Sequence, residues 1–448
     1  MKKILFILFI IHSSLLITNA QWVFTGFAPP GLGGGFAIST PNCSTIVLAG
    51  GPVGTGIVFR STNSGGSFIN ITGNLGSLEL YTVWAKNKDT IFVGDGGSSG
   101  GAGGNAKVYR TYNGGLNWTL LLSTGGSAGF INGIIFERPL QRFGIIQSDP
   151  PTGTGQPFWL YKTNDGGNTW TSLTVPGVPG AASLLNSVYC IDSLFFGFGL
   201  SGSPPRIYRT TNGGLTWIIT TLPLTGSFIT GITFSSDKQY GIAATSTSLP
   251  NIARTTDGGN SWFVINAGGS GYCNMRWVYS TNVCFLSGST GMNSIRKSTN
   301  AGANWSAMTT AGISGITQLG LAYENNNMCG YAIASDGSMI RLTETISGVE
   351  GNNGVPVSYK LFQNYPNPFN PSTVISFQLA VNSFASLKVY DVLGREVATL
   401  VNEQLKPGTY EVDWDVSGFS SGVYFYTLEA DPETNSGFRE TKKMLLIK

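Results

Sequence analysis

Short apolar runs alternate with polar, glycine-rich turns along nearly the whole chain. In the stretch from Phe228 to Thr255, three runs rich in β-branched and aromatic residues are separated by turn residues. Runs of this length and composition are typical of short antiparallel strands. We therefore predict an all-β chain, in which groups of four strands form successive units.

A nine-residue phrase punctuates this strand pattern six times. It reads Arg/Lys, Ser/Thr, x, Asn/Asp, x, Gly, x, Ser/Thr/Asn, Trp/Phe. Successive copies lie 50, 52, 47, 45 and 43 residues apart. A repeat of this period, with strands between the copies, predicts a β-propeller in which each repeat is one blade. The copies begin at Arg60, Arg110, Lys162, Arg209, Arg254 and Lys297.

The residue types of the phrase indicate a structural role. The Asn or Asp can bond its own backbone two residues on, the glycine tolerates the positive φ of a tight turn, and the aromatic caps a gap between sheets. We assign this role to Asn63, Gly65, Asn113, Gly115, Trp118, Asp165, Gly167, Trp170, Asn212, Gly214, Trp217, Asp257, Gly259, Trp262, Asn300, Gly302 and Trp305.

The number of blades follows from a seventh, incomplete repeat. Arg341 lies 44 residues after Lys297, in phase with the repeat, but no phrase follows it. We expect the segment Gln21 to Phe24 to supply the missing outer strand, with Trp22 in the place of the phrase aromatic. This pairing would remove a free sheet edge. We predict seven blades, with six and eight as alternatives.

The third copy of the phrase, Thr163 to Trp170, resembles the Asp-box of BNR, sortilin-like and photosystem II assembly factor-like propellers. The resemblance implies a propeller over residues 21–347 and places the boxes on the face away from any active site. It carries over the fold and no ligand.

The two ends of the chain differ in character from the repeats. Residues 1–20 have two lysines followed by an apolar run, which predicts a secretory signal peptide. Residues 348–354 form a polar linker, and residues 355–448 contain alternating strands typical of a small Ig-like β-sandwich. The motifs Tyr365–Thr373, Leu387–Val397 and Ser421–Tyr426 resemble, in order, the type A C-terminal sorting domain of the type IX secretion system.

That resemblance implies partners and a location. Residues 355–448 would bind the type IX secretion machinery and a sortase-like protease. The protein would be secreted, or held at the outer surface of a Gram-negative Bacteroidetes-like bacterium, after passing through the periplasm.

The composition excludes several classes of function. The single histidine is His12, inside the predicted signal peptide, so histidine-dependent catalysis and histidine-ligated zinc are excluded. A formal net charge of +3 without a basic stripe argues against nucleic-acid binding. We assign no metal site and no cofactor, because no cluster of ligands suggests one, and metal binding stays open. No stretch beyond the signal peptide is long and apolar enough for a transmembrane segment.

The cysteines are odd in number and include no CxxC pair. Four of them fall near predicted hairpins of four different blades. We therefore expect buried thiols, and we expect no disulfide framework. The five are Cys43, Cys190, Cys273, Cys284 and Cys329.

Binding is expected on the face opposite the boxes, where the longest loops lie. If strands A to D run outward from the axis, the A–B and C–D turns form a bottom face with the boxes, and the B–C and D–A loops form a top face. The candidate binding residues on the top face are Asp95, Asp149, Arg206 and Asp336.

Two functions fit this arrangement. We favour a propeller without catalytic activity that binds a polysaccharide or an envelope protein. The alternative is a BNR-type, sialidase-like glycoside hydrolase that uses Glu79, Asp95 or Asp149, because glycoside hydrolysis requires a pair of carboxyl groups. A sialidase also needs three arginines around the substrate carboxylate. Arg60, Arg110, Arg209 and Arg254 instead lie beside the boxes and indicate structural roles.

Overall fold

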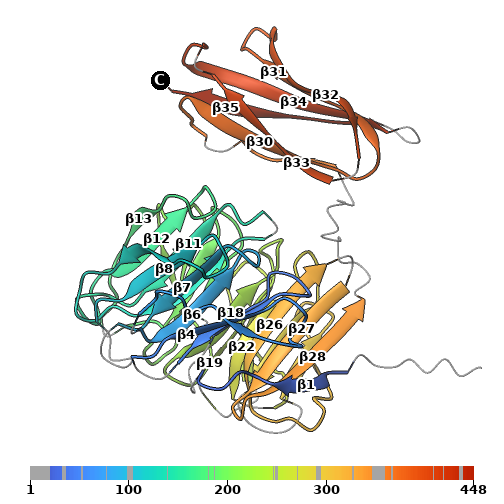
Figure 1. Ribbon diagram of the computed structural model, residues 1–448. Coiled ribbons are helices and arrows are strands. Elements are labelled where there is room, and N and C mark those ends of the chain that lie inside the picture. The colour runs from blue at the N-terminus through green and yellow to red at the C-terminus, as the bar shows by residue number, and fades with distance from the viewer. Residues whose placement is uncertain are drawn as a thin grey trace, which may run out of the picture.

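The computed structural model contains two all-β units, a ring of seven sheets and a smaller sandwich (Figure 1). It describes residues 21–447 apart from 33–36, 52–53, 77, 98–103, 139, 180, 186, 246, 248–250, 270, 289–293, 325–326, 346–358, 365–366, 407, 417 and 433–436. The predicted signal peptide and linker lie outside the described residues. Within the described part of the chain, no helix has the length and apolar character needed to cross a bilayer.

Seven four-stranded antiparallel sheets form the ring and confirm the predicted seven-bladed propeller. The first three blades, inner strand first, are β2 (Ala37–Ser39), β3 (Ile46–Gly50), β4 (Ile57–Ser61), β5 (Ile69–Asn70); β6 (Leu80–Ala85), β7 (Ile91–Asp95), β8 (Lys107–Thr111), β9 (Thr119–Ser123); and β10 (Ile131–Phe136), β11 (Gly144–Ser148), β12 (Phe158–Thr163), β13 (Thr171–Val175).

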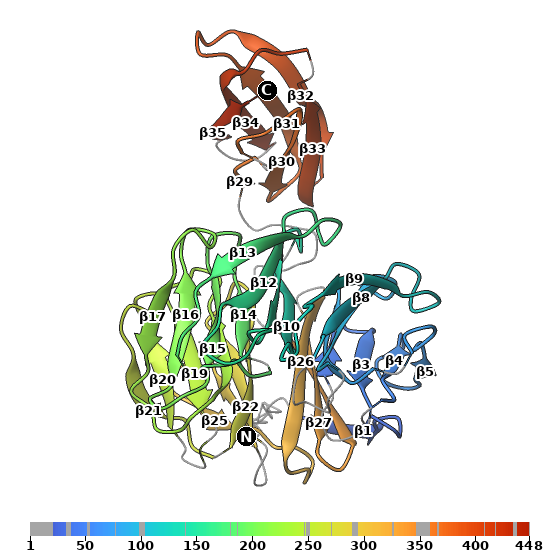
Figure 2. The same cartoon turned by 90° about the vertical axis from the view of Figure 1, so that its left-hand side faces the viewer.

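The next three blades repeat this order, with inner strands near the middle of the ring and outer strands at its rim (Figure 2). They are β14 (Val188–Cys190), β15 (Phe196–Leu200), β16 (Arg206–Thr210), β17 (Ile218–Thr221); β18 (Ile229–Phe234), β19 (Gly241–Thr245), β20 (Asn251–Thr255), β21 (Phe263–Asn266); and β22 (Tyr272–Trp277), β23 (Cys284–Gly288), β24 (Ile295–Ser298), β25 (Ser306–Ala307).

The seventh blade joins the two ends of the propeller. It consists of β26 (Ile316–Glu324), β27 (Asn327–Ala334), β28 (Ser338–Thr345) and, as its outer strand, β1 (Val23–Phe27). Val23 pairs with Arg341, and Figure 1 shows β1 along β28. The predicted closure is confirmed. Trp22 directly precedes the outer strand, as each box aromatic does, and it is only 1% exposed.

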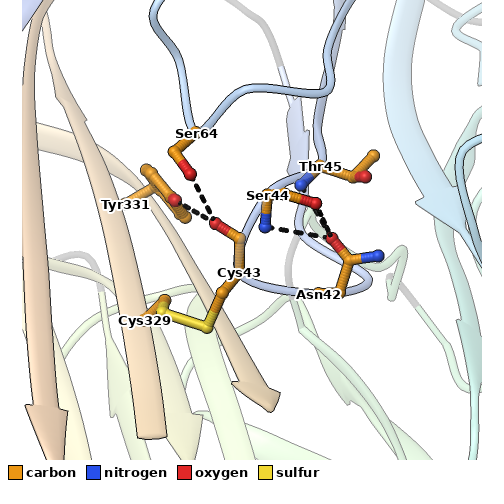
Figure 3. Close-up of a disulfide and its surroundings, with 7 residues drawn as sticks. All are labelled: Asn42, Cys43, Ser44, Thr45, Ser64, Cys329 and Tyr331. Atoms are coloured by element: carbon orange, nitrogen blue, oxygen red, sulfur yellow. Dashed lines mark hydrogen bonds between the residues drawn. A yellow bond between two sulfur atoms is a disulfide. The ribbon is translucent and has the colours of Figure 1, made fainter.

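A disulfide between Cys43 and Cys329 lies at the seam between the seventh and first blades (Figure 3). The expectation that these cysteines are separate thiols is therefore wrong. Cys43 lies in the β2–β3 turn and Cys329 in β27, and ring closure brings these positions together although 286 residues separate them. The Cys43 carbonyl also accepts hydrogen bonds from the Tyr331 hydroxyl and from Ser64 Oγ. The free cysteines are Cys190, Cys273 and Cys284.

Side-chain hydrogen bonds fix the turn in each box, as the third copy illustrates. Thr163 Oγ1 donates to Asp165 Oδ1 (2.8 Å) and accepts from the Gly167 N–H (2.8 Å). Asp165 Oδ1 accepts a hydrogen bond from the Thr169 N–H (2.9 Å), four residues later in the chain. The predicted bond from Asp165 to the N–H two residues later is wrong, because the Gly167 N–H donates to Thr163 instead. The left-handed backbone of Gly166 and Gly167 (φ 73° and 94°) brings the later N–H groups back over the carboxylate.

The basic residue that opens each phrase reaches the next blade. Arg60 Nη1 donates to the Gly114 carbonyl (3.2 Å), Lys162 Nζ to Gly213 (3.1 Å) and Arg254 Nε to Ala301 (2.8 Å). Arg110 and Arg209 do the same to Gly167 and Gly258, and Lys297 pairs with Glu344 of the seventh blade. These cations therefore join neighbouring blades, which supports the structural role expected for the arginines.

The box aromatics cap the gaps between blades to different extents. Trp118 is 4% exposed, and its indole N–H donates to the Ile71 carbonyl of the preceding blade (3.0 Å). Trp170 is half-buried and packs edge-on against Phe92 and Phe136. Capping by a fully buried ring thus holds for one box, and the other described box aromatics keep part of their surface in water.

The C-terminal unit is a β-sandwich, as expected. One sheet contains β29 (Lys360–Leu361), β30 (Ser372–Leu379) and β33 (Gly408–Asp415); the other contains β31 (Ser383–Tyr390), β32 (Glu396–Leu405), β34 (Gly422–Pro432) and β35 (Phe438–Leu446). Its core includes Phe369, Trp414 and Tyr426. An ion pair between Arg142 of the propeller and Glu411 of the sandwich lies between the two units (2.6 Å).

Candidate functional site

Two top-face carboxyls, Glu79 and Asp95, lie side by side in the second blade and are buried. Leu80 pairs with Asp95 across β6 and β7, and Glu79 accepts a hydrogen bond from the Tyr81 hydroxyl. Asp95 Oδ1 accepts from the N–H groups of Gly97 (3.2 Å) and Lys107 (2.6 Å). Burial raises the pKa of Asp95, although these two hydrogen bonds oppose the rise. Asp95 thus organises the start of its own loop.

Asp149 lies at the top of the third blade and links it to the fourth. Its Oδ1 accepts from Asn132 Nδ2 (2.8 Å) and from the Ser183 N–H (2.7 Å). Burial raises its pKa to about 6, and the two hydrogen bonds limit the rise. A carboxyl of this pKa can exchange a proton near neutral pH, which is a property of catalytic acids.

Arg206 and Asp336 occupy the predicted face but make few contacts. Arg206 begins β16 and is half-buried, with a buried Nε that has no partner. Asp336 is exposed in the turn between β27 and β28, where its Oδ1 accepts from the Ser338 N–H (2.8 Å). The structure thus brings Glu79 and Asp95 together, and it places Asp149, Arg206 and Asp336 in three other blades.

A cavity of about 200 Å³ lies along the axis of the ring, among residues of the inner strands. All seven inner strands contribute to its lining. None of the predicted site residues lines it. At the end of the inner strands, near the bottom face, its lining includes Trp84, Arg138, Arg276, Tyr279 and Tyr323.

Sequence reasoning missed these cavity residues. Arg138 and Arg276 lie outside the repeated phrase, at the bottom ends of β10 and β22. The sequence did contain a signal for them, because they are arginines at positions outside the repeated phrase, where the repeat does not require a basic residue. Among the described residues, no group of three or more His, Cys, Asp or Glu could hold a metal ion.

Comparison with known families identifies one segment of the chain. Residues 363–445 match the model of the secretion system C-terminal sorting domain. A search of the curated proteins finds no match to the chain.

Comparison with solved structures identifies the fold of the other unit. The chain resembles a structure of YCF48 bound to D1 peptide, with 14% identity over 73% of this chain and 96% of that one, and a TM-score of 0.51. It also resembles AFV00434, an ancestral GH74 enzyme, with 16% identity over 92% of this chain and 60% of that one, and a TM-score of 0.51. Identities this low establish the fold alone. The chain is therefore a seven-bladed β-propeller that carries a secretion-system C-terminal sorting domain.

Proposed function

We propose that the protein is a secreted or cell-surface propeller that binds a polysaccharide or an envelope protein and does not act as an enzyme. Its sorting domain, matched at residues 363–445, would direct export by the type IX secretion system. The machinery and a sortase-like protease would be the partners of this domain. The propeller would be the cargo, exposed at the outer surface or released from it.

The observation that carries the binding role is the state of the candidate catalytic carboxyls. Asp95 accepts two backbone N–H groups, Asp149 accepts one backbone and one side-chain N–H, and Glu79 is buried against Tyr81. A catalytic pair must face a substrate and exchange protons with it. Carboxyls that order loops favour a scaffold that presents those loops to a partner. The peptide bound to the YCF48 propeller is in accord with this role.

Binding is tested with the mature chain, residues 21–448, on immobilised polysaccharides and envelope fractions, with retention and released sugar scored together. Arg206→Ala and Asp336→Ala should weaken retention if the top face binds. Lys88→Ala is the matched control, since Lys88 is exposed in a bottom-face turn. If Lys88→Ala reduced retention as strongly as the top-face variants do, the assignment of binding to the top face would be contradicted.

Glycoside hydrolysis is the second candidate, favoured by the raised pKa of Asp149 and by the GH74 enzyme among the structural neighbours. Asp149→Asn separates the two functions cleanly. The same Oδ1 accepts both hydrogen bonds of Asp149, so the amide oxygen of asparagine can replace it. An enzyme should lose sugar release while keeping its fold, and a binding protein should show no sugar release before or after the change.

A further inference from the structure

Two guanidinium groups from opposite parts of the ring share the bottom end of the axial cavity. Arg138 follows β10 of the third blade, and Arg276 belongs to β22 of the sixth. Tyr323, from the seventh blade, lines the same part of the cavity. Its hydroxyl donates to the Trp277 carbonyl (3.3 Å), which fixes the ring beside Arg276.

The guanidinium groups of Arg138 and Arg276 have no acidic partner in the part of the chain that the structure describes. Among the described residues, neither Arg138 nor Arg276 forms an ion pair. Arg138 lies over the Trp84 ring (5.6 Å to the centroid), and Arg276 Nη1 donates to the carbonyl of its neighbour Met275 (2.9 Å). Most of the donors on both groups are therefore left for another partner.

Two acids of the adjacent bottom turns, Glu137 and Asp192, bind other groups. The Glu137 carboxylate accepts the N–H groups of Gln141, Arg142 and Phe143 within its own turn. Asp192 pairs with Lys238. Neither of these two carboxylates therefore supplies a counter-charge to the guanidinium groups at this end of the cavity.

The electrostatic consequences agree with this geometry. Burial lowers the pKa of Arg138. Burial also lowers the pKa of Arg276 to about 10, and the positive charge of Arg138 lowers it further. Two like charges held together in a half-buried site repel each other, and an anion between them would relieve both the repulsion and the loss of hydration.

We propose that the bottom end of the axial cavity is an oxyanion-binding site, formed by Arg138 and Arg276 with Tyr323 packed beside them, which takes a carboxylate, sulfate or phosphate group. Planar guanidinium forks match such groups through paired hydrogen bonds. The cavity of about 200 Å³ is large enough to admit one small anionic group. This site lies on the face opposite the predicted binding loops, so it does not depend on the proposed function.

The test is calorimetric titration of the mature chain at low ionic strength with sulfate, phosphate and acetate, with chloride as the reference anion. We expect saturable binding of at least one oxyanion, weakened at least tenfold in Arg138→Gln/Arg276→Gln and weakened less in Tyr323→Phe. The three oxyanions distinguish a tetrahedral ligand group from a carboxylate. Arg142→Gln is the matched control, because Arg142 lies on the same turn as Arg138 but pairs with Glu411.

Stability without added oxyanion provides a second readout. Removing two unpaired, mutually repelling charges should leave the melting temperature unchanged or raise it, whereas a purely structural role of the arginines predicts a lower one. If the double variant does not fold, a selenate soak of wild-type crystals should place an anomalous peak between the two guanidiniums. Absence of oxyanion binding, binding equal to that of chloride, or binding unaffected by the double substitution would overturn the proposal.

Discussion

Closure of the ring depends on a covalent bond as well as on strand pairing, and removing that bond gives the sharpest prediction. Cys43→Ser/Cys329→Ser deletes the disulfide at the seam between the first and seventh blades. The β1–β28 pairing in the seventh blade remains in the variant. We therefore expect the variant to fold, with lower stability and a seam that opens more easily.

The size of the effect follows from the length of chain that the disulfide closes. For a sequence separation of 286 residues, the chain-entropy model gives an upper limit of about 5–6 kcal/mol, and measured losses for native disulfides are about 2–5 kcal/mol. Unfolding entropy is roughly 2 cal/mol/K per residue, so a propeller of this length should melt roughly 3–7 °C lower.

The assay combines thermal unfolding with a count of thiols in denaturant. Unreduced wild-type protein should expose three thiols, Cys190, Cys273 and Cys284, and the reduced protein should expose all five cysteines. A reducing agent should lower the melting temperature of the wild type and leave that of the double variant unchanged. Five reactive thiols in unreduced protein purified from an oxidising compartment, or equal stability of the two proteins, would refute the reasoning.

Three further predictions concern single positions. Trp118→Ala should destabilise the propeller by about 3–5 kcal/mol and Trp170→Ala by roughly half as much, because only the first ring is fully buried; denaturant titration measures the difference. The raised pKa of Asp149 means that the folded state binds more protons than the unfolded chain between about pH 4 and 6, so stability should fall as pH rises through this window and Asp149→Asn should remove that slope. Val392→Ser/Leu393→Ser should reduce export without lowering sandwich stability, since both side chains are exposed at the tip of the β31–β32 turn; equal secretion of variant and wild type would exclude this tip as a contact of the machinery.

The repetitive part of the fold could be predicted because its signal is local and occurs many times. Each phrase contains its own turn, as the bonds from Thr163 and Asp165 show, and the period between phrases fixes the blade. The closing role of Trp22 could also be predicted, because an incomplete last blade needs an outer strand. Six independent copies of one pattern leave little freedom in the interpretation.

The disulfide and the cavity could not be predicted in the same way, because both depend on closure of the ring. Cys43 and Cys329 are far apart in the sequence and become neighbours only because the last blade meets the first. Arg138 and Arg276 lie in blades three apart and meet only at the axis. The sequence places Asp95 and Asp149 in polar loops, but it does not reveal which backbone N–H groups donate hydrogen bonds to their carboxyl groups.

The division of the arginines between two tasks indicates where ligand recognition should be sought. An arginine in phase with the repeat donates hydrogen bonds to the next blade, as Arg254 does to the Ala301 carbonyl. Fewer of its N–H donors are then available to bind a ligand. Arg138 and Arg276 are out of phase. Arg138 lies over the Trp84 ring and Arg276 Nη1 donates to the Met275 carbonyl, which leaves most of their donors for a ligand beside one cavity, at the expense of their hydration. Residues that depart from the repeat are therefore better candidates for recognition than the repeated residues that define the fold.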